Sequence, residues 1–319
     1  MTPESVLTEL EPWQPHLQEL HRQFFEKSGD RCLLWVNPAQ GDPFSDEQLV
    51  DERKVRVPIR HANFELKLAS YVVVLDLSKS RDADIFKRSA AIAWQAWEQG
   101  NLQAFNGQAI GGWVASDQSA QSLALHWATN CHIHSVNGLT KLLRFHDPGV
   151  REWLWPALTT KQQERLLGPA KFVIAFNRNQ KLMAHALTSG VTKASDDNIG
   201  KLLLTLAQWE QVGDYAVLHS AWLRCCLSIP AFRQILTTQT CWERRIFAAL
   251  HVAYEYGIYD SQDRELFATH AILLGADFHE HEKMHPVWEK TRTGNYYGAA
   301  CEDVSARPVD QLQDYLHSK

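Results

Sequence analysis

The motif with the clearest chemical meaning is His281-Glu282-Lys283-Met284-His285, which has the spacing H-E-x-x-H. On a helix this spacing places two imidazoles on one face, where they bind Zn²⁺ beside a glutamate that acts as general base. The context argues against a helix, because Pro286 disfavours helical dihedral angles at His285 and Gly275 ends a helical pattern just upstream. We therefore favour a solvated loop, and a zinc-dependent hydrolase using His281, Glu282 and His285 is the alternative.

Other residues that could support chemistry have simpler structural explanations. Cys131, His132 and His134 lie where a helical pattern meets a strand, and no second cluster at ligand spacing completes a tetrahedral metal site. Asp76 ends an apolar strand, where α/β enzymes often place carboxylates, but an aspartate that begins a turn is the simpler expectation. Gly111-Gly112 is too short a signal to indicate a phosphate-binding loop. We therefore predict no catalytic residues, no metal and no cofactor, and expect that the protein is not an enzyme.

Composition and charge exclude several classes of partner. The 319 residues are 45% apolar and 22% charged, and the net charge of -5 gives no reason to expect binding to nucleic acid or to an anionic membrane. No apolar run approaches the roughly 20 residues that span a bilayer. Residues 1–15 carry three glutamates and lack the features of a secretory signal, and the six cysteines form no C-x-x-C pair. These features predict a cytoplasmic protein with reduced thiols.

The first part of the chain alternates between strand and helix patterns. An N-terminal helix is expected over residues 4–27, and the run at 71–75 is β-branched and continuous, as in a strand buried on both faces. This order predicts an α/β (α+β) lobe with a mixed or parallel sheet. The expected strands lie at residues 32–36, 71–75, 111–115, 142–145, 172–176 and 182–187, and the expected helices include 82–99 and one that carries Leu123 and Trp127.

Beyond residue 195 the apolar period becomes helical throughout. One stripe ends at Gly257, and a second, which includes His270, opens at Asp260 and closes at Gly275. We expect His270 to be a hydrogen-bonded core histidine. The pattern predicts two domains, an α/β domain over residues 1–190 and a helical lobe over 191–319, with the boundary near 188–197. The residues of the first stripe are Trp242, Ile246, Ala249, Leu250 and Ala253.

The strand expected at 142–145 stops at an Asp-Pro pair. Asp147 can cap a helix, and Pro148 suits its first position because a proline has no amide hydrogen to lose and a preset φ. Val150 and Leu154 then recur at helical spacing. We call residues 144–148 the motif corner, and Arg144 is the charged residue for which the corner provides no structural role.

The motif corner, Arg144-Phe145-His146-Asp147-Pro148, is followed by the apolar segment 153–158 and by Leu166-Leu167-Gly168-Pro169. In this order the motifs resemble the effector chaperone or adaptor family of bacterial type VI secretion, which has an R-F-[YF]-D-P motif, a leucine-rich helix and a G-P stop. The resemblance covers about residues 30–175. A looser resemblance, over residues 256–263 and 275–278, is to the helical C-terminal region of such adaptors.

The resemblance implies a non-enzymatic, cytoplasmic protein that holds a toxic effector and delivers it to the C-terminal region of the trimeric spike protein VgrG. The implied partners are therefore a secreted effector protein and VgrG. Arg144, Phe145, Asp147 and Pro148 carry over as the family motif. They build the corner or contact a partner directly. We expect one lobe to bind the effector and the other to bind VgrG, in either assignment.

Overall fold

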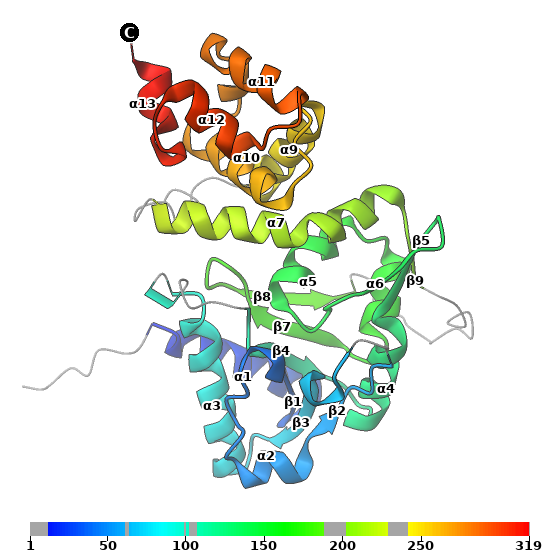
Figure 1. Ribbon diagram of the computed structural model, residues 1–319. Coiled ribbons are helices and arrows are strands. Elements are labelled where there is room, and N and C mark those ends of the chain that lie inside the picture. The colour runs from blue at the N-terminus through cyan, green and yellow to red at the C-terminus, as the bar shows by residue number, and fades with distance from the viewer. Residues whose placement is uncertain are drawn as a thin grey trace, which may run out of the picture. The chain divides into compact units, whose positions relative to one another are not determined.

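The computed structural model describes residues 12–60, 64–98, 100–101, 107–187, 202–228 and 242–318. The chain divides into two compact units, Met1–Trp209 and Glu210–Lys319 (Figure 1). The expected domain boundary at 190/191 lies in residues 188–201, outside the described residues. The expected N-terminal helix is present as α1, Gln14–Ser28, and residues 4–11 of the prediction also lie outside the described part.

A six-stranded sheet forms the centre of the first unit, and together with the helical second unit it confirms the α+β class. Each pair of neighbouring strands for which a register is defined is antiparallel, so the expectation of a mixed or parallel sheet was wrong for this sheet. In the order β2-β3-β1-β4-β7-β8, the strands are β1 Arg31–Val36, β2 Val55–Arg56, β3 Tyr71–Asp76, β4 Ile110–Ala115, β7 Phe172–Phe176 and β8 Leu182–Ala186.

The position of β1 explains this difference. Helix α3, Ser80–Gln95, connects β3 to β4, and these two strands run in the same direction, as strands joined through a crossover helix do. They are not neighbours, because β1 lies between them and is antiparallel to both. The alternation of strand and helix in the sequence therefore indicated a true crossover, but it contained no sign of the inserted strand.

Helices cover both faces of this sheet (Figure 1). On one face, Phe24 of α1 and Phe86 of α3 make ring contacts with each other, and Phe86 also contacts Trp113 of β4. On the other face, Trp127 of α4, Ala120–Asn130, stacks on Trp35 of β1. Burial of these large rings dominates the core of the first unit. The remaining helices of this unit include α2 Gln48–Arg53, α5 Pro148–Leu154 and α6 Thr160–Leu167.

A second, three-stranded sheet has the order β6-β5-β9, with β5 His132–Ser135, β6 Thr140–Leu142 and β9 Leu202–Leu204. It is mixed, because β5 is antiparallel to β6 and parallel to β9. The strand expected at 142–145 thus ends at Leu142. Strand β9 contradicts the expectation of helix throughout the chain beyond residue 195, since its three apolar residues are too few to show a period of two.

The second unit is helical in its described part. The predicted stripe of α9 is confirmed, since Trp242, Ile246, Ala249, Leu250 and Ala253 are all buried. No described helix combines the length and the apolar character that crossing a membrane requires. The helices are α7 Leu206–Ser228, which starts in the first unit, α9 Trp242–Glu255, α10 Ser261–Leu273, α11 His285–Arg292, α12 Tyr297–Ser305 and α13 Leu312–His317.

Candidate binding site at the motif corner

The aspartate of the motif corner caps α5 as its sequence predicts. Oδ1 of Asp147 accepts a hydrogen bond of 2.9 Å from the amide of Gly149, and Pro148 takes the first position of the helix. The other carboxylate oxygen accepts a hydrogen bond of 2.6 Å from Nη2 of Arg144. Asp147 is buried, whereas the side chain of Arg144 is 51% exposed. Arg144 is therefore the motif residue that presents charge at the surface.

The remaining motif residues point into the protein. Phe145 is buried and makes ring contacts with Trp35 and Trp155, at centroid distances of 6.0 and 6.5 Å. Pro148 is buried as well. Phe145, Asp147 and Pro148 thus build the corner, and in doing so they set the position of Arg144.

Arg151 is the central residue of this region, and the sequence analysis did not identify it. It is only 1% exposed, and its Nη1 donates a hydrogen bond of 2.8 Å to the carbonyl oxygen of Phe145 while Nη2 donates to that of Gly111. The guanidinium carbon lies 5.7 Å from the centroid of the Trp35 ring and 5.8 Å from that of Phe145. Burial lowers the pKa of Arg151 to about 9, so the side chain is still a cation at pH 7. It ties the corner to strand β4.

The Gly111-Gly112 pair allows this close approach. Gly112 has φ +135°, and a Cβ atom there would lie 2.5 Å from the carbonyl oxygen of Ile174 and 3.2 Å from Nη2 of Arg151. Gly111 sits at an irregularity in the pairing of β1 with β4, and a Cβ atom there would lie 2.8 Å from the carbonyl oxygen of His146. The pair is therefore a packing feature of β4.

A small hollow, partly open to solvent, lies beside the motif corner, and we call it the corner hollow. Two of its residues, Trp35 and Trp127, stack with centroids 3.8 Å apart and planes 6° apart. None of the described residues that line it is acidic. The lining consists of Trp35, Val57, Ile59, Ser70, Trp127, Asn130, Cys131, Leu143, Phe145, His146 and Leu166.

The titratable groups of the corner hollow are poorly suited to catalysis. Desolvation lowers the pKa of His146 to about 4, so its ring is neutral at pH 7 and a weak base. Burial raises the pKa of the Cys131 thiol to about 11, so the thiolate nucleophile is scarce at neutral pH. Neither group is therefore suited to acid–base or nucleophilic chemistry.

The H-E-x-x-H residues do not form a continuous helix. His281 has extended dihedral angles, φ -62° and ψ 134°, residues Glu282–Met284 form a single 3-10 turn, and His285 begins α11. The helical geometry that a zinc-binding motif of this spacing needs is therefore missing. Nδ1 of His281 instead accepts a hydrogen bond of 3.2 Å from the amide of Lys283. Among the described residues, no group of three histidine, cysteine or acidic side chains is placed to hold a metal ion.

Cys131, His132 and His134 do not form a common site, because they make separate local contacts. Cys131 is the C-cap residue of α4 and lines the corner hollow, whereas His132 and His134 belong to β5. Nδ1 of His134 lies 3.0 Å from the hydroxyl oxygen of Thr140 on the neighbouring strand. These contacts are structural, as the sequence analysis expected.

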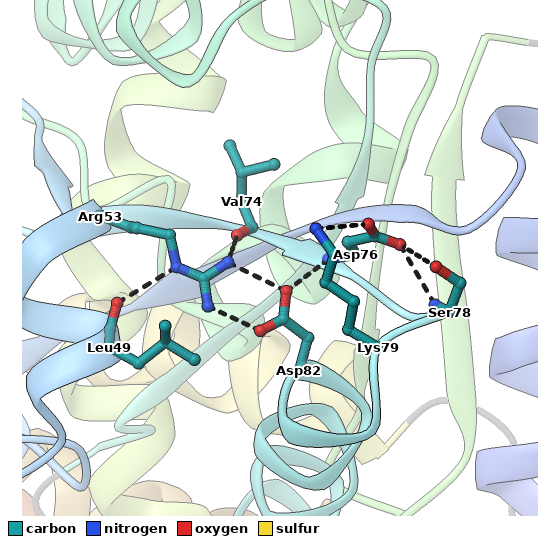
Figure 2. Close-up of polar contacts among 7 residues, drawn as sticks. All are labelled: Leu49, Arg53, Val74, Asp76, Ser78, Lys79 and Asp82. Atoms are coloured by element: carbon teal, nitrogen blue, oxygen red, sulfur yellow. Dashed lines mark hydrogen bonds and ion pairs between the residues drawn. The ribbon is translucent and has the colours of Figure 1, made fainter.

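Asp76 begins a turn, which was the simpler of the two expectations for this residue. Its Oδ1 accepts hydrogen bonds from the amide and the hydroxyl of Ser78, and Oδ2 lies 3.0 Å from Nζ of Lys79 (Figure 2). The backbone amide of Asp76 donates to buried Asp82, whose carboxylate receives two hydrogen bonds from Arg53. The hydrogen bonds from Arg53 lower the pKa of Asp82. This network links the ends of α2 and β3 to the first turn of α3. Its charged side chains are therefore already paired and stabilise the fold.

Two buried histidines predict sensitivity to acid. Burial lowers the pKa of His185, on β8, to about 3 and that of His270, on α10, to about 4. The Nδ1 atom of His270 lies 2.8 Å from the Tyr297 hydroxyl, which confirms it as a hydrogen-bonded core histidine. In the unfolded chain the pKa of a histidine is near 6.5. The two buried histidines therefore contribute their full stabilisation above that pH, and the free energy of unfolding falls as the pH decreases below it.

We expect each of these histidines to reduce the free energy of unfolding by about 2 kcal/mol between pH 6.5 and 5, at about 1.4 kcal/mol per pH unit. Urea unfolding at several pH values measures the slope. His185→Gln and His270→Gln should each flatten it, while His317→Gln, at an exposed site, should leave it unchanged. Equal slopes in all four proteins would contradict this account.

The comparison with protein families identifies one matching segment. Residues 71–165, which are 95 of the 319 residues, match the model of a family described as "Domain of unknown function (DUF4123)". The segment runs from β3 into α6 and contains the motif corner, Gly111-Gly112 and Arg151. No curated protein and no solved structure matches the chain.

Proposed function

We propose that this chain is a type VI secretion adaptor that binds a toxic effector and recruits it to the C-terminal region of the VgrG spike protein. The observation that carries the proposal is the DUF4123 match, because this family is known from such adaptors and the matched residues include the motif corner. The order of motifs from the corner to Gly168-Pro169 supports the same assignment. In this proposal the protein acts in the cytoplasm, before the spike is launched.

The corner hollow is the surface of the first unit that we assign to a partner. Its tryptophans and Phe145 are at most 5% exposed, so among the lining residues the apolar side chain that a partner can cover is partly buried Ile59, and burying apolar area drives association. Arg144 follows the lining residue Leu143 and is half exposed. The Arg144 guanidinium donates one hydrogen bond to Asp147 and has further N–H groups that can donate to a partner. The corner therefore presents a cation that suits a carboxylate of the partner.

The proposed role requires binding and no catalysis. The neutral ring of His146 and the protonated thiol of Cys131 leave the corner hollow without an activated base or nucleophile. The described part of the chain also presents the H-E-x-x-H residues in a geometry unsuited to zinc. Both observations support an adaptor that is not an enzyme.

We expect genes for VgrG and an effector beside the gene of this protein, and the test is co-purification with their products. The wild-type chain should retain both proteins, and Arg144→Ala and Ile59→Glu should each weaken binding of one of them at least about tenfold. Ile59 lines the corner hollow and is only partly buried, so a glutamate there adds charge without filling the core. Leu125→Glu is the matched control, since Leu125 is exposed and does not line the hollow.

The two variants also separate the site from the function. Arg144→Ala leaves the buried Asp147 carboxylate with the Gly149 amide as a donor, so the variant should fold, and thermal unfolding measures the stability lost. If neither VgrG nor the effector binds the wild-type chain, the adaptor function is wrong. If both bind and neither variant weakens either interaction, the function stands and the corner hollow is not the contact surface.

A further inference from the structure

The second unit exposes three tyrosine rings around the first turn of α10. Tyr254, Tyr259 and Tyr296 are 40%, 73% and 68% exposed. Large aromatic side chains are usually buried in monomers and are enriched where proteins bind one another. We call these three residues the tyrosine cluster.

Backbone contacts fix the positions of the tyrosines. Gly257, with φ +78°, follows the end of α9, and the turn then places Asp260 as the N-cap of α10. Asp263, in the first turn of α10, accepts hydrogen bonds from the amides of Tyr297 and Gly298, at 2.7 and 3.0 Å. Since Tyr296 immediately precedes Tyr297, this contact holds it beside the same turn.

The rings themselves are supported from one side. The Tyr254 and Tyr259 centroids are 5.9 Å apart. The guanidinium carbon of Arg264 lies 4.0 Å from the centroid of the Tyr254 ring, and Nη2 of Arg264 lies 2.9 Å from Oδ1 of Asp214. Both charged side chains are largely buried, so Arg264 is fixed beneath the ring. The Tyr254 ring is therefore held in place before any partner arrives, which lowers the entropy lost on binding.

Carboxylates accompany the exposed rings. Glu255 and Asp260 are exposed and are the direct sequence neighbours of Tyr254 and Tyr259. Burial is the largest cause of the raised pKa of Tyr254; Arg264 lowers this pKa, and Asp214 and Glu210 raise it. Tyrosine faces and carboxylates both attract cations, through the ring quadrupole and through direct charge.

We propose that the tyrosine cluster is a docking surface for an extended, basic segment of a partner protein. Lysine or arginine side chains of that segment lie over the faces of Tyr259 and Tyr296, and the carboxylates of Glu255 and Asp260 accept their N–H groups. The proposal does not depend on the adaptor function, because it rests on contacts within the second unit. The partner segment expected at this unit is basic, whereas the partner group expected at Arg144 is a carboxylate.

Labelled peptides test the proposal with the full chain. A short peptide of alternating arginine and serine should bind in a fluorescence anisotropy titration, and a glutamate–serine peptide of equal length should not. Tyr259→Ala combined with Tyr296→Ala should weaken binding of the basic peptide at least about tenfold. Tyr259→Phe combined with Tyr296→Phe should restore it, since phenylalanine keeps the ring face.

Net charge alone also attracts a basic peptide to this chain, and the tyrosine variants remove that ambiguity because they leave every charge in place. Leu125→Ala, at an exposed leucine of the first unit, is the control. Equal affinity of the wild type and the double alanine variant would overturn the proposal, as would equal binding of the basic and acidic peptides. Matching thermal unfolding curves would show that the exposed substitutions leave the fold intact.

Discussion

Replacing Arg151 with methionine is expected to lower the free energy of unfolding by about 3 to 5 kcal/mol. The substitution leaves the carbonyl oxygens of Phe145 and Gly111 without their donors in a region that water does not reach. It also removes the cation that lies within 6 Å of the centroids of both the Trp35 and the Phe145 rings. Methionine avoids the desolvation of a buried charge, but the two unpaired carbonyl groups remain and outweigh that gain.

Urea unfolding followed by tryptophan fluorescence measures this effect, since Trp35 and Trp127 form the stacked pair next to Arg151. Arg151→Lys is the matched variant, because an ammonium group keeps the charge but cannot form the planar fork that reaches two carbonyl groups. It should be intermediate in stability. An Arg151→Met protein within about 0.5 kcal/mol of wild type would show that the guanidinium does not hold the corner to β4.

Gly112→Ala should destabilise the protein by about 4 kcal/mol or more, or prevent folding. The new Cβ atom would lie 2.5 Å from the carbonyl oxygen of Ile174, which belongs to the backbone of the neighbouring strand β7 and cannot turn away. A φ of +135° adds strain for any residue with a side chain. The same Cβ would press on Nη2 of Arg151, so the substitution also disturbs the corner.

Gly100→Ala is the control for this substitution. A Cβ atom at Gly100 meets no atom within 4 Å, and the residue has no positive φ. Thermal unfolding should therefore separate the two alanine variants clearly, with Gly100→Ala close to wild type. A Gly112→Ala protein as stable as Gly100→Ala would contradict the packing described for β4 and the motif corner.

Features with local causes were predictable from the sequence. Asp147 and Asp260 cap helices because their side chains accept bonds from amides two or three residues away. The sequence Thr160-Lys161-Gln162-Gln163 also fits a capping box, but the structure forms the box with Thr159 and Gln162, one residue earlier. The error is small because Thr159 and Thr160 are both suitable caps, and the sequence does not decide between adjacent threonines.

Features that depend on distant residues were not predictable. The insertion of β1 between β3 and β4 follows from tertiary pairing, and no local pattern contains it. Arg151 falls on a short helix where a lone arginine is ordinarily exposed. Its burial depends on the Gly111-Gly112 pair some 40 residues earlier, and that pair within an apolar strand was the signal of a close approach.

The sequence therefore predicted one part of the candidate site, the motif corner, and not the other. The motif corner was identified as a strand-to-helix junction with Arg144 unexplained, and the structure adds the corner hollow beside it. The hollow combines residues from β1, α4 and the segment around Ile59, which are far apart in the chain. Only the fold brings them together, so the sequence could indicate the motif but not the surface.

The adaptor function is tested most directly by the mass of the complex that the purified proteins form. Size-exclusion chromatography with light scattering should show one species containing this chain, the effector and VgrG. Mixing the effector and VgrG without the chain should give the separate proteins. An effector that joins VgrG equally well without the chain, or a chain that elutes alone from both proteins, would contradict the account.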